Sequence, residues 1–235
     1  MCQHYFLWVT CDIFYRSYEK DFDWLFYSLK SLEKYGNGFG RVHIAIPAND
    51  AGEMDFVGSP EVHLVTDRCD GYMAQQITKL HADEFCRAEY VVHVDSDCVF
   101  FRDISPLDLF LDGKPVMLRE KCESPWQGVT ERSLGWYDEY EYMRRLPIVY
   151  PRWIYGEFRK WMQKKHGMSV DDWIIKQPGH EFSEFNTLGQ WAYEFHRDKF
   201  TWLEPIEFPK YCNQYWSWGG VTPEIKGIIE NIIAD

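Results

Sequence analysis

The sequence predicts an α/β fold in which a mainly parallel sheet is flanked by helices. Strand-like apolar runs alternate with segments of helical periodicity, an order typical of parallel sheets connected through helices. The 235 residues contain no linker rich in glycine, serine or proline, so we expect a single domain. Hydrophobic residues make up 46% of the chain, which is enough for a sizeable core.

The alternation is clearest in the first half of the chain. Asp21 stands at an N-cap position before apolar residues at helical spacing, and Gly36 follows that segment. Connections between such strands are right-handed, so helices are expected on both faces of the sheet. We predict strands over residues 4–10, 42–46, 62–65, 90–94 and 115–118, and helices over 22–32 and 71–85.

The second half, from residue 119, is richer in Trp, Tyr, Glu and Arg. A long helix is predicted over residues 154–165, and we expect this half to complete the sheet and to build a binding pocket. Aromatic residues make up 18% of the chain and include 11 Trp. Some of these rings can serve as stacking surfaces, although most are expected to pack in the core.

Composition and charge exclude several classes of protein. The net charge of −12 argues against broad contact with a nucleic-acid backbone. No apolar stretch approaches the ~20 residues that span a bilayer, and no secretory leader precedes the first strand-like run. Seven cysteines without a Cys-x-x-Cys pair indicate a reducing compartment, with no disulfide framework and no zinc site. We therefore expect a soluble, cytoplasmic protein.

Two carboxylates, Asp95 and Asp97, end the apolar run that begins at Tyr90. Because Asp is poorly tolerated within a strand covered on both faces, we expect the acids at the carboxyl end of that strand. Ligands bind at this edge in open α/β sheets, and two acids separated by one residue can approach one divalent cation together. A solvated turn is the structural alternative.

Three blocks of sequence contain most of the polar residues of interest. They are GYMAQQITKL at 71–80, HVDSD at 93–97 and FSEFNTLG at 182–189. With these blocks the chain resembles the GT-A glycosyltransferases, and more narrowly an uncharacterised group of predicted transferases. The resemblance covers most of the chain from residue 5 to about residue 200.

The resemblance implies a GT-A-like, Rossmann-type fold that moves a sugar from a nucleotide diphosphate sugar, first of all a UDP-sugar, to an acceptor hydroxyl. Residues 1–118 would form the nucleotide-sugar-binding half, and residues 119–235 the acceptor-binding half with a C-terminal tail. A cation, Mn²⁺ or Mg²⁺, would stabilise the charge that grows on the leaving diphosphate. Inverting and retaining mechanisms both stay open.

For the metal, the resemblance implies that Asp97 binds the cation directly, while Asp95 contacts the ribose or the metal through water. Ser96, between them, would also face the donor. GT-A enzymes often draw a further ligand from a C-terminal histidine, and we favour His196 over His180 because it lies beyond the third block. The alternative for His196 is packing on a partly apolar helix.

For the nucleotide sugar, Thr10 and Asp12 follow the predicted first strand, where GT-A folds hold the base and ribose. A strand-ending turn is the alternative. Gln75 and Lys79 are four residues apart on one helix face, with Gln76 beside them. The resemblance implies that this face meets the donor sugar or diphosphate, and a solvated helix face is the alternative.

Glu184 occupies the place where GT-A enzymes present an acid to the acceptor and the anomeric carbon. In an inverting enzyme this carboxylate removes the proton of the acceptor hydroxyl. In a retaining enzyme Glu184, or an amide such as Gln190, would lie near the reacting carbon. A first-turn acid that satisfies backbone donors of its helix is the structural alternative.

Two other segments each have a functional and a structural interpretation. Arg144, Arg145 and Arg152 stand among aromatic residues and could bind a phosphorylated acceptor, or they could pair with the acids of 139–141 on the surface. The segment YWSWGG at 215–220 could form an aromatic lid hinged on glycine, or pack a C-terminal tail onto the domain.

The sequence thus predicts a metal-dependent glycosyltransferase whose acceptor is a glycan, a lipid-linked sugar, a protein or a modified nucleobase. Two other classes stay open. One is a sugar- or nucleotide-binding module without catalysis. The other is a sugar nucleotidyltransferase, which is disfavoured because no glycine-rich phosphate loop with a basic residue lies near the N-terminus.

Overall fold

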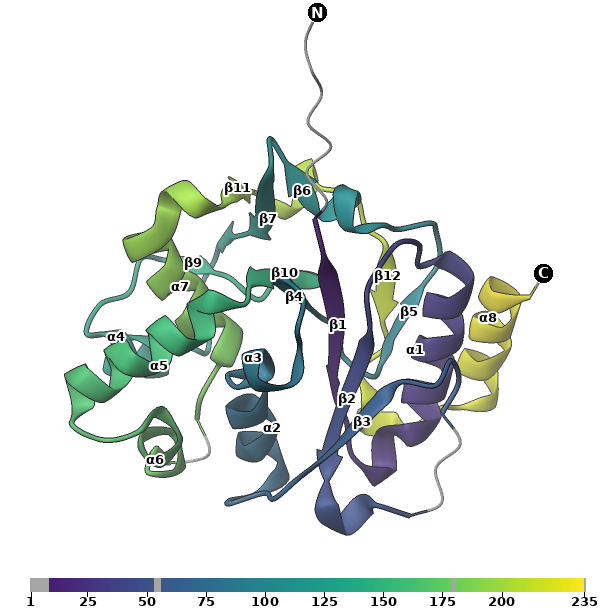
Figure 1. The fold of residues 1–235 in the computed structure, drawn as a ribbon, viewed down its shortest axis with the longest axis horizontal. Helices are drawn as coiled ribbons and strands as arrows, with labels where there is room; N and C mark the ends of the chain where they lie inside the picture. The colour runs from purple at the N-terminus through teal and green to yellow at the C-terminus, as the bar shows by residue number, and fades with distance from the viewer. Residues whose placement is uncertain (1–8, 53–55, 179–180, 235) are drawn as a thin grey trace, which may run out of the picture.

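A computed structural model describes residues 9–52, 56–178 and 181–234. A five-stranded sheet in the order β10-β4-β1-β2-β3 forms its centre (Figure 1). Strands β1 to β4 are parallel, and β10 runs antiparallel to β4. This confirms the mainly parallel sheet and its completion by the second half of the chain. The strands are β1 (Cys11–Arg16), β2 (Val42–Pro47), β3 (Glu61–Val65), β4 (Tyr90–His93) and β10 (Ile148–Pro151).

Helices flank the sheet on both sides, with α1 and α8 on one side and α2, α3 and α5 on the other (Figure 1). Most of their buried residues join those of the strands in one large hydrophobic core, whereas Ile229 of α8 packs with Trp24 and Tyr27 of α1 in a second, smaller cluster. The helices are α1 (Phe22–Tyr35), α2 (Gly71–Lys79), α3 (Ala82–Phe85), α4 (Gln127–Leu134), α5 (Trp153–His166), α6 (Val170–Ile175), α7 (Glu184–His196) and α8 (Pro223–Ile233). Within the described residues, no helix has the length and apolar character needed to cross a bilayer.

Three small sheets surround the central one. Strand β12 brings the C-terminal part of the chain beside β5, the strand that follows Asp97. The small sheets pair β5 (Cys98–Phe100) with β12 (Cys212–Gln214), β7 (Lys114–Leu118) with β6 (Phe110–Leu111) and β11 (Thr201–Leu203), and β8 (Glu120–Lys121) with β9 (Tyr140–Glu141).

Most predicted elements are confirmed within a few residues, but two are wrong. The first strand spans Cys11–Arg16, whereas Val9 and Thr10 are outside it and residues 4–8 are outside the described part. The predicted helix 71–85 breaks into α2 and α3, and at the break the Leu80 carbonyl accepts a hydrogen bond from Arg159 at 2.7 Å. Residues 115–118 do form a strand, in a small sheet.

Candidate functional site

The acid pair lies at the carboxyl end of β4, as predicted. Strand β4 ends at His93, and Asp95, Ser96 and Asp97 form the turn that leads into β5. The Cys98 amide closes this turn by donating to the Asp95 carbonyl at 3.0 Å. Because β4 is parallel to β1, the turn lies beside the end of β1, where Ser96 Oγ donates to Ser17 Oγ at 2.9 Å.

Lys79, at the end of α2, connects the acid pair to the third sequence block. Its Nζ lies 2.8 Å from Asp95 Oδ1 and 3.0 Å from Glu184 Oε1, and its side chain is only 7% exposed. The ammonium also lies 5.0 Å from the centre of the Phe185 ring. Burial by itself would lower the pKa of Lys79, but the charges of Asp95 and Glu184 outweigh it and raise the pKa. The lysine is therefore a permanent cation between two carboxylates.

Glu184 is held in place by α2 as well. It is the first residue of α7, where backbone amides have no partner within the helix. Its amide donates to Gln76 Oε1 at 3.1 Å, so Gln76 caps α7 from the neighbouring helix. Gln76 and Lys79 are three residues apart on one face of α2, and together they position both the backbone and the side chain of Glu184.

Asp97 is enclosed by the C-terminal segment that follows β12. Its Oδ2 accepts from the Ser217 amide at 3.1 Å, and its carbonyl accepts from the Tyr215 amide at 3.0 Å. Trp216, between these amides, has a φ of 58°, a conformation uncommon for a bulky residue. Burial and the charge of Asp95 raise the pKa of Asp97 to about 6.

A third acid, Asp21, also belongs to this region. It precedes α1, and burial raises its pKa although a hydrogen bond from the Ser217 side chain lowers it. The charge of Asp95 raises the pKa of Asp21 further. Asp21, Asp95 and Asp97 therefore lie close enough together that the charges of Asp95 and Asp21 raise the pKa of Asp97, and no basic side chain is among the largest influences on that pKa.

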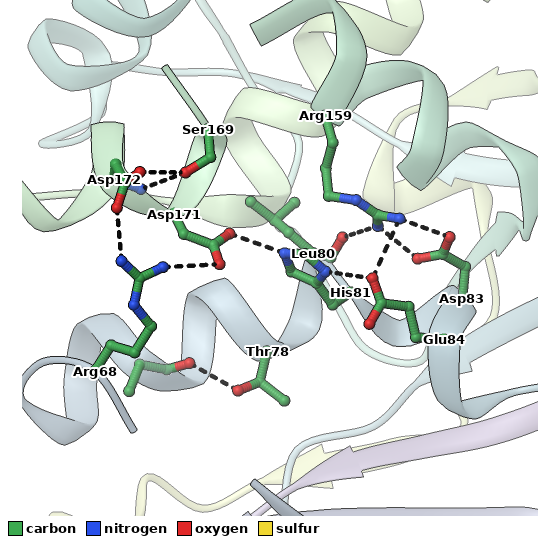
Figure 2. A network of polar contacts seen from close by, with 11 residues as sticks. Arg68, Thr78, Leu80, His81, Asp83, Glu84, Arg159, Ser169, Asp171 and Asp172 are labelled. Carbon is green, nitrogen blue, oxygen red and sulfur yellow. Dashed lines mark hydrogen bonds and ion pairs between the residues drawn. The ribbon is translucent and has the colours of Figure 1, made fainter. Parts of the chain in front are cut away.

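A polar network behind the site joins α2 and α3 to α5 and α6 (Figure 2). His81 contacts Asp171 at 2.8 Å and Glu84 at 2.7 Å. Arg159 forms a forked ion pair with Asp83, at 2.6 and 2.9 Å, and also contacts the Leu80 carbonyl. These bonds hold the chain immediately after Lys79, which positions the lysine over the sheet edge.

The predicted donor residues separate into two groups. Gln76, Lys79, Asp95, Ser96 and Asp97 come together with Glu184 at the carboxyl edge of the sheet. Gln75 is half-buried one turn before Lys79, and within the described residues it has no hydrogen bond or ion pair with these side chains.

Thr10 and Asp12 do not join that group, because the first strand was predicted too early in the chain. Asp12 is the second residue of β1 and lies at the opposite, amino edge of the sheet. Its carboxylate accepts hydrogen bonds from the amides of Arg41, Arg87 and Ala88 at 2.8–2.9 Å. A Cβ on Gly40 would lie 2.4 Å from Asp12 Oδ1, so this packing requires glycine. Asp12 therefore holds two loops to β1, and Thr10 Oγ1 likewise bonds the Glu89 amide.

His196 is also remote from the acid pair. It is the last residue of α7, whereas Glu184 is the first, so the two lie about 18 Å apart along the helix at 1.5 Å per residue. Its Nε2 lies 3.3 Å from Glu157, and its ring packs on Trp153 and Trp191. The structure therefore does not bring His196 to the acid pair, and His180 lies outside the described residues.

Two arginines of the predicted cluster, Arg144 and Arg145, have partners within the protein. Arg144 contacts Glu120 at 3.1 Å and also Glu141, while Arg145 donates to the Phe208 carbonyl. The contact of Arg144 with Glu141 matches the predicted pairing with the acids of 139–141, although Glu141 is buried rather than on the surface. Trp216 and Trp218 are 60% and 89% exposed beside Asp97, with ring centres 5.9 Å apart, so this aromatic pair is available to a ligand.

Sequence reasoning missed several residues around the site. Asp21, Gln214 and Ser217 come near Asp95 or Asp97 only through tertiary contacts. A forked ion pair between Arg16 and Asp67, at 2.8 and 2.9 Å, lies at the end of β1. A correct position for β1 would have drawn attention to Arg16 and Ser17, since the carboxyl ends of parallel strands meet at one edge.

The fold and this edge define the class of protein as an α/β protein with a GT-A-like fold. The fold is similar to that in the crystal structure of galactosyltransferase LgtC in complex with donor and acceptor sugar analogs, with a TM-score of 0.54 and 12% identity over 94% of this chain and 95% of that chain. Residues 53–187, more than half of the chain, match a family of unknown function, DUF6492, and the chain belongs to that family. No curated protein matches the sequence.

Proposed function

We propose that this protein is a metal-dependent glycosyltransferase that moves a sugar from a nucleotide diphosphate sugar, in the first place a UDP-sugar, to an acceptor hydroxyl. The observation that carries the proposal is the meeting of Asp95, Asp97, Lys79 and Glu184 at one edge of a GT-A-like fold. Ligands bind at the carboxyl ends of strands in open sheets, and all four side chains lie at that end of β4.

The side chains at this edge suit a hard divalent cation. Burial, and then the charge of Asp95, raise the pKa of Asp97. Carboxylate oxygens are the ligands that Mg²⁺ and Mn²⁺ prefer. We assign Asp97 as the direct ligand and Asp95 as the supporting acid, because Asp95 is already paired with Lys79. The cation, when bound, would supply Lewis-acid stabilisation of the leaving diphosphate.

We assign the other roles in the proposed reaction to side chains around the acid pair. Glu184 is the carboxylate that we assign to the reacting centre, and Lys79 orients it while compensating its charge. Gln76 and Ser96 are buried and bonded to Glu184 and Ser17, so we assign them to positioning the site rather than to binding the donor. Trp216 and Trp218 offer exposed rings on which a base or a sugar can stack.

The test combines ligand binding with turnover. Thermal unfolding is followed with nucleoside diphosphates and their sugars, with and without Mn²⁺, for the natural chain, Asp97→Asn and the exposed control Asp103→Asn. At ~100-fold excess over Kd, a ligand adds about 2.7 kcal/mol of stability. We expect one nucleotide to stabilise the natural chain and the control only with Mn²⁺, and not to stabilise Asp97→Asn.

Turnover separates the enzyme from a binding module. The nucleotide sugar that binds is incubated with a panel of hydroxyl acceptors, and release of the nucleoside diphosphate is measured. Transfer that is lost in Glu184→Gln supports the proposal. Mn²⁺-dependent binding without transfer or hydrolysis would identify a sugar-nucleotide-binding module, and the absence of any nucleotide effect would overturn the proposed donor site.

A further inference from the structure

Two histidines and a glutamate meet on the outer two strands of the sheet, away from the acid pair. His43 is the second residue of β2, and Glu61 and His63 lie on the edge strand β3, where their side chains share one face. The register places His43 directly beside Glu61. One potential ligand atom of each of these three side chains lies within 4.8 Å of the others.

The distances within this group match those between the ligands of a tetrahedral cation. His43 Nδ1 lies 3.0 Å from His63 Nε2 and 3.5 Å from Glu61 Oε2. Two ligands bonded to Zn²⁺ at about 2.0–2.1 Å in tetrahedral geometry are themselves about 3.3 Å apart. His43 Nδ1 has at most one proton to offer, so it cannot satisfy both neighbours by hydrogen bonding alone. A cation would satisfy all three atoms together.

The surroundings of His43 are those of a metal-binding histidine. Its ring is fully buried, and its Nε2 has no hydrogen-bond partner within the described part of the chain. That atom lies 3.5 Å from Asp12 Oδ2. Histidine ligands commonly direct the second ring nitrogen to a carboxylate, which orients the ring and keeps the lone pair on the ligating nitrogen.

The remaining groups are compatible with a cation. Glu61 pairs with Arg41 through Oε1, which leaves Oε2 directed at His43. The side chain of Glu61 is 39% exposed, and His63 is partly exposed, so the group is open to solvent.

We propose that His43, Glu61 and His63 form a second metal site, specific for a zinc-type divalent cation, that fastens the edge strand β3 to β2. Cysteine spacing predicted no zinc site in this chain, and the donor set here consists of imidazoles and a carboxylate instead. Three protein ligands leave a fourth position for water on the exposed side. The site is independent of the proposed transferase reaction.

Co²⁺ absorption on the whole 235-residue chain tests this site, because the visible bands of Co²⁺ report its ligands and geometry. Co²⁺ and competing Zn²⁺ are titrated into the natural chain, His63→Gln, Glu61→Gln, Asp97→Asn and the matched histidine control His196→Gln. We expect one Co²⁺ with tetrahedral bands that Zn²⁺ displaces. Affinity should fall by about 100-fold or more in His63→Gln and Glu61→Gln, and stay unchanged in Asp97→Asn and His196→Gln.

The outcomes that overturn the proposal are specific. Unchanged binding in His63→Gln, or loss of binding in Asp97→Asn alone, would place the cation elsewhere. No binding to the natural chain would leave an ordinary hydrogen bond between His43 and His63. A thiolate charge-transfer band that is lost in Cys86→Ala would assign the metal to Asp12, His43 and Cys86, which also lie within 4.8 Å of one another.

Discussion

The ammonium of Lys79 lies 3.0 Å from Glu184 Oε1 and so joins the end of α2 to the first residue of α7. The two residues are far apart in sequence and lie in different blocks, yet each is nearly buried and each is the other's ion-pair partner. Asp95, 2.8 Å from the same ammonium, extends the contact to the acid pair. Any change at Lys79 therefore affects both the acid pair and Glu184.

Replacing Lys79 with Met should lower the free energy of unfolding by about 3–5 kcal/mol, because two carboxylates would lose their buried cation. Urea unfolding measures this change. The double variant Lys79→Met/Glu184→Gln is the control, and it should recover part of the loss because one carboxylate is removed. A loss below about 1 kcal/mol in the single variant would show that solvent, rather than the lysine, compensates these acids.

Asp97→Asn should stabilise the metal-free protein at neutral pH. The pKa of Asp97 is about 6 in the folded state against an ordinary value of 3.8. The folded protein therefore holds this proton between pH 3.8 and 6 while the unfolded chain has lost it, so the stability from Asp97 falls as the pH rises through this window. Above pH 6 the loss of folding stability caused by Asp97 reaches its full value of about 3 kcal/mol.

Unfolding of the natural chain and Asp97→Asn at pH 3.5 and pH 8 measures this difference. The variant should be more stable at pH 8 and no more stable at pH 3.5. Equal stabilities at pH 8 would contradict a raised pKa of Asp97.

Mn²⁺ binding at the acid pair should weaken in acid. The direct ligand must be deprotonated, so each pH unit below about 6 should lower the affinity about tenfold, while the affinity should be nearly constant from pH 7 to 8. Isothermal titration at several pH values checks this, with Asp103→Asn as the matched control. An affinity that does not vary between pH 5 and 8 would exclude Asp97 as the ligand.

Gln76→Ala should destabilise the protein more than Gln75→Ala, although the two residues are neighbours in the sequence. Gln76 accepts the Glu184 amide, so its loss leaves a buried donor unsatisfied and should cost about 1–3 kcal/mol of stability. Gln75 is half-buried on another part of α2, and its loss should change stability by about 0.5 kcal/mol or less. Equal effects on thermal unfolding would mean that Gln76 does not cap α7.

Periodicity predicted the long elements but not every boundary. Helix α1, strands β2 to β4 and helix α5 were predicted correctly because turn residues such as Gly36 and Pro47 bound them. The apolar run from residue 4 to Arg16 has no such internal signal, so its strand was predicted too early. Pairing of Cys11–Arg16 with β2 and β4 decides which part forms β1. At the break after Lys79, the Leu80 carbonyl accepts a hydrogen bond from Arg159, a residue 79 positions further along the chain.

The sequence by itself determined the α/β class and the position of the acids at the end of β4, because these follow from local periodicity and the intolerance of buried strands for Asp. Only the tertiary structure decided which polar residues share a site. It brings Gln76, Lys79 and Glu184 together. Asp12 lies at the opposite edge of the sheet, and His196 lies about 18 Å from Glu184 along α7. Contacts between distant segments depend on strand register and helix packing, which the spacing of residues along the chain does not encode.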